Sequence, residues 1–230
     1  MTTAEKLTKI AENQSKVFEA GQKAEYDKFW DIFQENGNKT HYSFAFAGYG
    51  WTSDVFYPKY NMKPQYTSSM FQQSGMEIDL VQRFEECGVT LDTSKSLQVG
   101  SMFYNTRFTR VGVIDCRGTT ASISGLCSYS RYLHTIDKII VSASHTWGSS
   151  FVNCVALENV DFEGVIGAAI DFKDCVKLSK ASITSIINAL SATTSGLTVT
   201  LSKAAKEATF TTDEWSALIA TKPNWTISLV

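Results

Sequence analysis

The sequence has few prolines and few histidines, and its charged residues do not cluster. Its 230 residues include only three prolines and three histidines, and lysine and arginine form no basic cluster. With 21 basic and 23 acidic residues the formal net charge is −2, so we expect no nucleic-acid surface, which would need grouped cations to displace counterions. No apolar run reaches the roughly 18 residues that a membrane-spanning helix needs, so membrane insertion is not expected either.

Cysteine is scarce, and its pattern argues against both zinc and a disulfide framework. The five cysteines, an odd number, are Cys87, Cys116, Cys127, Cys154 and Cys175, and no two have CxxC spacing. No metal and no cofactor are therefore predicted. For Cys154 and Cys175 we expect the role of a small buried apolar residue, with a disulfide between them as the alternative. The N-terminal residues lack the apolar stretch of an export signal, so we expect synthesis in a reducing cytoplasm.

Common catalytic motifs are missing from the chain. It has no glycine-rich phosphate loop, no GxSxG nucleophile elbow and no HExxH zinc motif. The histidines His41, His134 and His145 have no cysteine or aspartate placed to complete a nucleophilic triad. Asp161 and Glu163 would share one face of a strand, but no substrate-shaped context surrounds them. No catalytic residue is predicted and we expect no enzyme; a carbohydrate-active enzyme using this carboxylate pair is a remote alternative.

One phrase occurs twice and is the most informative feature of the chain. Phe-Val-Asn-Cys-Val-Ala-Leu over 151–157 matches Phe-Lys-Asp-Cys-Val-Lys-Leu over 172–178, and both continue into alternating apolar residues. Aligning Phe103 and Cys127 with the first residue of each phrase gives steps of 24, 24 and 21 residues. Such repetition favours a stacked solenoid, in which each unit buries its apolar side against its neighbours.

We therefore predict an α+β fold in four parts. These are an oligomerisation or docking helix over 1–36, an aromatic-rich linker or N-terminal cap over 37–67, a repeat region over 68–190, and a C-terminal cap over 191–230. Within the repeat region we expect a short helix from 78 to 84 and another from 182 to 190, capped by Ser179 or Ser182. The C-terminal cap should be a strand at 197–201, a helix opening at Thr212 and a strand at 225–229.

The first part shows a heptad pattern over a helix expected from 4 to about 34. Apolar and small residues recur at alternating steps of three and four, as in a coiled coil, between positions held mostly by lysine and glutamate. The residues of this seam are Leu7, Ile10, Gln14, Val17, Gly21 and Ala24. Gln14 and Gly21 weaken the seam, since glycine costs about 1 kcal/mol relative to alanine in a helix. The alternative is a single amphipathic helix packed on its own domain.

Aromatic residues crowd the second part of the chain. Tyr42-Ser-Phe-Ala-Phe46 alternates like a strand, and the residues up to Tyr66 predict an ordered loop punctuated by glycine and proline. One interpretation is a cap that covers the open apolar end of the stack. The other is a platform on which sugar rings stack. In that case the exposed aromatic residues expected to bind are Tyr49, Trp51, Tyr57, Tyr60 and, from the repeat region, Trp147.

The doubled phrase resembles leucine-rich repeats of the BspA type, in which an aromatic residue precedes Cys or Asn, Leu and an alternating apolar strand. The layout of a short helix containing Ala4 to Asn13, the segment Phe46 to Trp51 and then repeats is similar to proteins encoded in tail or fibre regions of phages and prophages of Gram-positive gut bacteria. The resemblance implies a leucine-rich-repeat solenoid and a virion structural protein of the tail, fibre or baseplate appendage that attaches to the host.

That resemblance also implies partners and a location. The chain would form a homo-oligomer, a dimer or trimer, through its N-terminal helix and would contact other virion proteins and a host surface glycan or protein. It would reside in the virion after synthesis in the host cytoplasm. The alternative is a bacterial leucine-rich-repeat adhesin or protein–protein interaction module, in the cytoplasm or at the cell surface, because such repeats serve many recognition tasks.

The heptad pattern predicts self-association. Purified protein with residues 1–35 intact should sediment as a dimer or trimer at micromolar concentration, because the seam needs a second helix to cover its apolar side. Sedimentation velocity measures this directly. A single monomeric species under these conditions would show the prediction to be wrong.

Overall fold

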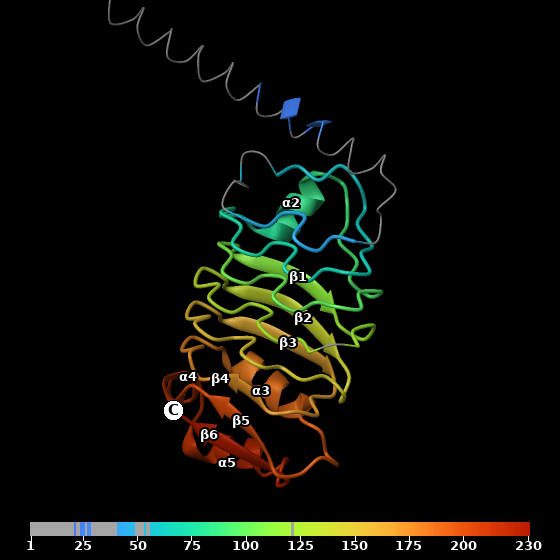
Figure 1. Ribbon diagram of the computed structural model, residues 1–230. Helices are drawn as coiled ribbons and strands as arrows, with labels where there is room; N and C mark the ends of the chain where they lie inside the picture. The colour runs from blue at the N-terminus through green and yellow to red at the C-terminus, as the bar shows by residue number, and fades with distance from the viewer. Residues whose placement is uncertain are drawn as a thin grey trace, which may run out of the picture.

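A computed structural model of the chain shows an elongated stack (Figure 1). The structure describes residues 21, 24, 25, 27, 28, 41–48, 53, 56–120 and 122–230. Of the predicted seam, Leu7, Ile10, Gln14 and Val17 lie outside these residues, whereas Gly21 and Ala24 are helical and exposed. From the green segments to the red ones, successive stretches of the chain occupy successive levels (Figure 1). Neighbours in space therefore come mostly from adjacent levels, which we call layers.

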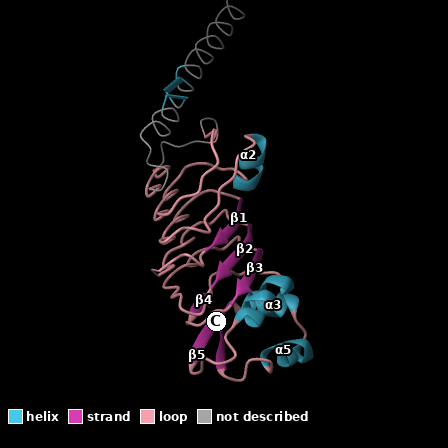
Figure 2. Ribbon diagram, turned by 90° about the vertical axis from the view of Figure 1, so that its right-hand side faces the viewer, coloured by secondary structure: helices cyan, strands magenta, loops and turns pink. Residues whose placement is uncertain are grey.

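Helices and strands are mixed along the described chain, which confirms an α+β composition. In order they are α2 (Leu80–Glu86), β1 (Arg110–Asp115), β2 (Thr135–Val141), β3 (Asn159–Gly164), β4 (Ile170–Phe172), α3 (Lys180–Ala189), β5 (Leu197–Leu201), α4 (Lys203–Thr209), α5 (Thr212–Ile219) and β6 (Trp225–Leu229). The strands form two parallel sheets, β1-β2-β3 and β4-β5-β6. Figure 2 shows the strands with α2 and α3 along one side of the stack and loops along the other.

The first sheet is held by rows of apolar residues that cross its strands. β-Branched and aromatic side chains favour a pleated surface with one buried face. Two rows run through the paired strands and point into the core, Val111–Ile136–Val160 and Ile114–Ile139–Phe162. Because the strands are parallel, the chain returns through a long loop between each pair. These loops form the far side of the core.

On the loop side, the residues aligned in the sequence follow one another through the stack. The backbone N–H of Phe103 donates at 2.8 Å to a backbone carbonyl in the layer that contains Cys127. The N–H of Cys127 donates at 2.9 Å to a backbone carbonyl in the layer that contains Phe151. The rings of Phe151 and Phe172 stack with centroids 4.4 Å apart. All four side chains are at most 2% exposed. The steps of 24, 24 and 21 residues thus correspond to steps between adjacent layers.

A second column lies three residues further along each layer and carries buried hydroxyl and thiol groups. Its members are Ser74, Thr106, Ser130, Cys154 and Cys175. The Ser130 hydroxyl donates to the Phe103 carbonyl of the neighbouring layer at 2.5 Å, and the Cys154 thiol donates to the Cys127 carbonyl at 3.0 Å. These bonds satisfy carbonyl groups that water cannot reach.

The cysteines confirm the predicted small buried role and not the disulfide alternative. All five are free, and Cys116, Cys127, Cys154 and Cys175 are buried. Burial raises the pKa of the Cys116 and Cys154 thiols to about 12, so both stay protonated and uncharged at neutral pH. A protonated thiol is the form that can donate to a carbonyl.

Helices cover both edges of the first sheet. At one edge Asp79, the N-cap of α2, forms a bridge with Arg110 of β1. At the other, α3 lies against β3 and offers serine hydroxyls in place of a fourth strand. The N–H of Val160 donates to Ser182 Oγ at 2.9 Å and that of Phe162 to Ser185 Oγ at 2.8 Å. An edge strand with open N–H groups invites another chain, and α3 closes this one.

The predicted strand over Tyr42–Phe46 is wrong. Residues 43–46 form a turn, and Phe44 has a positive φ of 60°. Tyr42 and Phe46 are buried while Phe44 is 63% exposed, so a turn produces the same alternation in burial as a strand would. The Phe46 ring stacks on Phe71 at 5.3 Å, which places this turn in the same loop-side column as the deeper layers.

The C-terminal elements confirm the predicted strand, helix and strand, with one helix added. The two strands are β5 and β6, which pair in parallel, and α4 lies between β5 and α5 in sequence. Thr211 caps α5: its hydroxyl accepts from the Glu214 N–H, and the Glu214 carboxylate accepts from the Thr211 N–H. This reciprocal arrangement is a capping box. The helices expected over 78–84 and 182–190 are α2 and α3, with Ser179 as the cap of α3.

The edge of β3 depends on one buried hydroxyl. Replacing Ser182, which is 3% exposed, by alanine leaves the Val160 N–H without its partner and leaves the Glu158 carbonyl with one donor, the Ser179 N–H, instead of two. We expect the free energy of unfolding to fall by about 1–3 kcal/mol, because the unpaired buried N–H costs its desolvation energy. Urea denaturation measures the loss.

The matched control for this substitution is Ser216→Ala on α5. Ser216 is exposed on its helix. Its replacement should change stability by no more than about 0.5 kcal/mol. Equal effects of the two substitutions would contradict a specific role for Ser182.

Glu214 predicts a dependence of stability on acid pH. Hydrogen bonds from Lys180 and Thr211 lower its pKa to about 2. A lowered pKa in the folded state contributes stability above the ordinary pKa of glutamate, about 4.3, and this contribution is lost as pH falls toward 2. Thermal midpoints measured from pH 6 to 2.5 should fall less steeply for Glu214→Gln. Glu207→Gln on α4, whose ion pair with Lys203 is longer at 3.8 Å, should keep the steep fall.

Candidate binding face and groove

The outward side chains of β1–β3 form a face on which charges of both signs alternate. Arg110 of β1 donates to both carboxylate oxygens of Asp137 on β2, at 2.7 and 2.9 Å. Lys138 of β2 donates to Glu163 of β3 at 2.9 Å and lies 3.8 Å from Asp161. The hydrogen bond from Arg110 to Asp137 raises the pKa of Arg110, and that from Lys138 to Glu163 raises the pKa of Lys138. The face offers paired donors and acceptors in fixed positions.

Asp161 and Glu163 point the same way, as the period of two predicts, and they share Lys138. Asp161 also accepts a hydrogen bond from Ser185 Oγ at 2.7 Å. Both carboxylates thus have a cation or a hydroxyl as partner. The geometry suits recognition of polar groups through hydrogen bonds.

The three histidines occupy separate environments. His41 stacks on Tyr66 with ring centroids 4.2 Å apart, and His134 Nδ1 lies 3.5 Å from Glu158. His145 is buried, with its Nε2 3.1 Å from the Thr119 carbonyl oxygen. Among the described residues no group of three or more His, Cys, Asp or Glu side chains could hold a metal ion.

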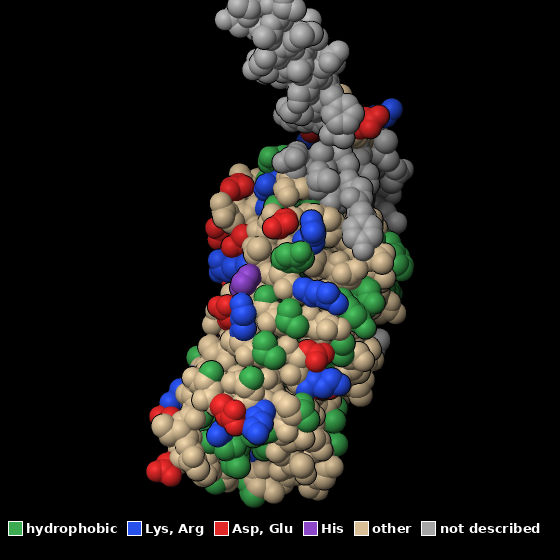
Figure 3. Space-filling view, turned by 90° about the vertical axis from the view of Figure 1, so that its left-hand side faces the viewer, with side chains coloured by type: hydrophobic (Ala, Val, Ile, Leu, Met, Phe, Trp, Pro, Cys, Tyr) green, Lys and Arg blue, Asp and Glu red, His purple; other side chains and the backbone are tan. Residues whose placement is uncertain are grey.

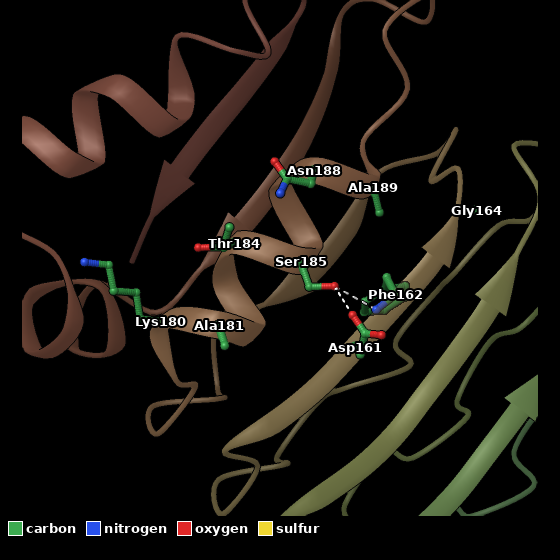
Figure 4. Close-up of a pocket in the computed structure, with 9 residues that line it drawn as sticks. All are labelled: Asp161, Phe162, Gly164, Lys180, Ala181, Thr184, Ser185, Asn188 and Ala189. Atoms are coloured by element: carbon green, nitrogen blue, oxygen red, sulfur yellow. Dashed lines mark hydrogen bonds between the residues drawn. The ribbon is translucent and has the colours of Figure 1, made fainter.

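An open groove of about 820 Å³ lies between β3 and α3 (Figure 4). Small residues line it because β3 ends at Gly164 and α3 turns Ala181 and Ala189 toward the strand. Polar side chains complete the lining: Asp161, Thr184, Ser185 and Asn188. Figure 4 shows Ser185 directed at Asp161, whereas Lys180 extends away from both and donates to Glu214 at 2.6 Å. Hydroxyl, amide and carboxylate groups around a shallow hollow match the hydroxyl groups of a sugar.

The aromatic residues predicted to bind a ligand have different positions. Tyr57 is 50% exposed, and the guanidinium carbon of Arg83 lies 4.4 Å from its ring centre. Tyr60 is partly buried and packs against the core. Tyr49 and Trp51 lie outside the described residues.

The expectation that Trp147 is exposed is wrong. Its side chain is 1% exposed and makes an edge contact with Phe162 at 5.6 Å. The neighbouring layer holds Ile123 and Leu126 at the corresponding positions, where this layer has Trp147 and Ser150. The large indole and the small serine together fill the space of two medium residues, as close packing requires.

One surface group was missed by sequence reasoning. Tyr104 and Tyr129 lie with ring centroids 5.5 Å apart, and the Arg107 guanidinium lies 5.2 Å from the centre of the Tyr132 ring. The available signal was the recurrence of tyrosine beside arginine in Tyr-Asn-Thr-Arg (104–107) and Tyr-Ser-Arg-Tyr (129–132).

Comparisons with known proteins give no relative from which a role could be transferred. No protein family, no curated protein and no solved structure matches the chain. Within the described residues, no helix combines the length and the apolar character needed to cross a membrane.

Proposed function

We propose that the chain is a non-enzymatic attachment protein, built as a leucine-rich-repeat solenoid, that binds a host surface glycan through the outer face of β1–β3 and the groove beside α3. The observation that carries this proposal is the groove itself: it opens at the end of a rigid sheet and is lined by hydrogen-bonding side chains. A rigid wall suits binding by surface contact, since little ordering is needed when a ligand arrives.

The solenoid interpretation has support from the spacing between layers. Phe103, Cys127 and Phe151 are 24 residues apart and are joined layer to layer by backbone hydrogen bonds. Three residues on, Thr106, Ser130 and Cys154 hold the same column of buried donors. The same residue classes at the same offsets are what a repeat unit with nearest-neighbour contacts would produce.

The proposal places the protein in a virion, as part of a tail, fibre or baseplate appendage. Self-association through residues 1–36 would present two or three copies of the face at once. Linked weak contacts give firm attachment because the second contact forms at high effective concentration. This matters for an open groove, which buries less of a ligand than a closed pocket does.

The groove supplies a test that leaves the fold intact. The side chains of Thr184 and Asn188 line the groove on α3. Replacing both by alanine should reduce attachment of fluorescently labelled protein to host cells about thirtyfold, because the loss of two hydrogen bonds near 1 kcal/mol each has this size. Flow cytometry measures attachment.

The matched control is a pair of exposed positions on α5. Ser216→Ala with Thr212→Ala removes two exposed polar side chains outside the groove and should leave attachment unchanged. Unaltered attachment by the groove variant would exclude the groove as the binding site. Absence of the polypeptide from purified particles, checked by mass spectrometry, would exclude the virion role and favour a bacterial adhesin.

A further inference from the structure

A second hollow lies beside the residues that lead into β1 and β2, at the end of the first sheet where these strands begin. It measures about 500 Å³, and we call it the Tyr–Arg hollow. The charged and aromatic side chains that line it belong to Arg107, Tyr129, Arg131 and Tyr132. We propose that the Tyr–Arg hollow binds an acidic glycan, through a sugar ring that carries a carboxylate. The inference goes beyond the proposed function, since it adds a second site, separate from the groove beside α3, and names the class of glycan that this site takes.

The aromatic part of the hollow presents ring faces to solvent. Tyr129 is 39% exposed and Tyr132 is 44% exposed, whereas most aromatic residues of the described chain lie in the core. The C–H groups of a sugar ring carry slight positive charge and pack favourably on the negative face of an aromatic ring. Figure 3 faces the side at which the chain enters the strands and shows exposed apolar side chains among charges of both signs.

Two guanidinium groups flank these rings. Arg107 is half exposed, lies over Tyr132, and its ion pair with Glu77 is long at 3.7 Å. Arg131 is exposed, and no ion pair to another described residue holds its side chain. A guanidinium can donate two parallel hydrogen bonds to a carboxylate and stacks on aromatic faces, which the ammonium of lysine does less well. The charge in the hollow is therefore available to an anion.

The backbone at Tyr129 is unusual for its residue type. It has a φ of +66°, while the corresponding positions of the adjacent layers are Asn105 at +53° and Asn153 at +56°. Asparagine adopts this left-handed conformation readily, but a bulky aromatic residue does so at a cost in energy. Such conformations persist where the surroundings enforce them, and they occur often at functional sites. Gln73 at +58° holds the equivalent position of another layer, so the fold imposes this conformation and Tyr129 bears its cost.

The base of the hollow is fixed before any ligand binds. The N–H of Thr106 donates to Ser130 Oγ at 3.1 Å, and the N–H of Tyr129 donates to the Val152 carbonyl at 2.7 Å. Leu133, directly after Tyr132, is fully buried. Arg131 and Tyr132 thus stand between two buried anchors, Ser130 and Leu133. A site held in this way loses little conformational freedom on binding.

Backbone pairing favours a sugar over an acidic peptide. A peptide commonly binds by adding a strand, which requires unpaired N–H and C=O groups. Here the N–H groups of Asn105, Thr106 and Tyr129 already donate within the protein. With these N–H groups taken, the ring faces and guanidinium groups are the main binding groups that the hollow offers.

The test is calorimetry of the full-length protein with a galacturonic acid hexamer and with its methyl ester, which has the same rings without the charge. We expect the hexamer to bind and the ester to bind about tenfold more weakly or not at all. Arg131→Gln should weaken hexamer binding about tenfold. Lys95→Gln, which removes the same charge from an exposed position elsewhere, should leave it unchanged.

The ring contribution is tested at Tyr132. Tyr132→Leu should weaken binding, and Tyr132→Phe, which keeps the ring, should restore it. Two results would overturn the proposal by showing that the hollow recognises charge alone. One is a penta-glutamate peptide that binds as tightly as the hexamer, and the other is a hexamer that binds Tyr132→Leu as well as the unaltered protein.

The outcome separates this inference from the attachment role. No hexamer binding with normal attachment to host cells means that the Tyr–Arg hollow has no acidic glycan ligand, while the proposed function stands. Hexamer binding without attachment to any cell means that the Tyr–Arg hollow has an acidic glycan ligand, while the proposed function is wrong.

Discussion

Backbone groups inside the stack are shielded from water, so they must find their partners in the next layer. On the loop side the N–H groups of Phe71, Phe103 and Cys127 each donate to a carbonyl of the adjacent layer at 2.8–2.9 Å. A shift of one residue between layers would leave such groups unpaired, at a cost of about 1–3 kcal/mol each. These bonds therefore set the register of the layers. Once the register is set, it also determines which side chains point inward.

The same requirement explains how the first sheet ends. A layer with no neighbour exposes a row of N–H groups on its last strand, and β3 would be such a strand. Ser182 and Ser185, one turn of α3 apart, accept from two of those groups. A helix cannot pair with a strand through its own backbone, because its peptide groups are already used. Closing the edge therefore needs side chains with acceptor oxygens, and this leaves the groove between α3 and β3.

The repeat could be seen in the sequence where equivalent buried positions hold the same residue type, and could not be seen where different residue types fill them equally well. Cys154 and Cys175 were visible as a pair because both use a thiol. Ser130 donates to the neighbouring layer through a hydroxyl instead, and Ser74 and Thr106 hold the equivalent positions, so the sequence shows no repeated residue there. Trp147 with Ser150 replaces two medium residues by a large and a small one, which breaks the pattern while preserving the packed volume. The predicted exposure of Trp147 failed for this reason.

Helices and strands of the C-terminal part could be predicted because their signals are local, such as the capping box of Thr211 and Glu214. Candidate sites could not, since the groove needs β3 beside α3 and the Tyr–Arg hollow needs two layers brought together. Within the four residues from Ser130 to Leu133, the outer two are buried and serve the fold, while Arg131 and Tyr132 are exposed. Exposed residues of this kind can change without disturbing the register of the layers. A stack can therefore alter what it binds while its interior stays the same, and binding specificity is the property least readable from the repeat pattern.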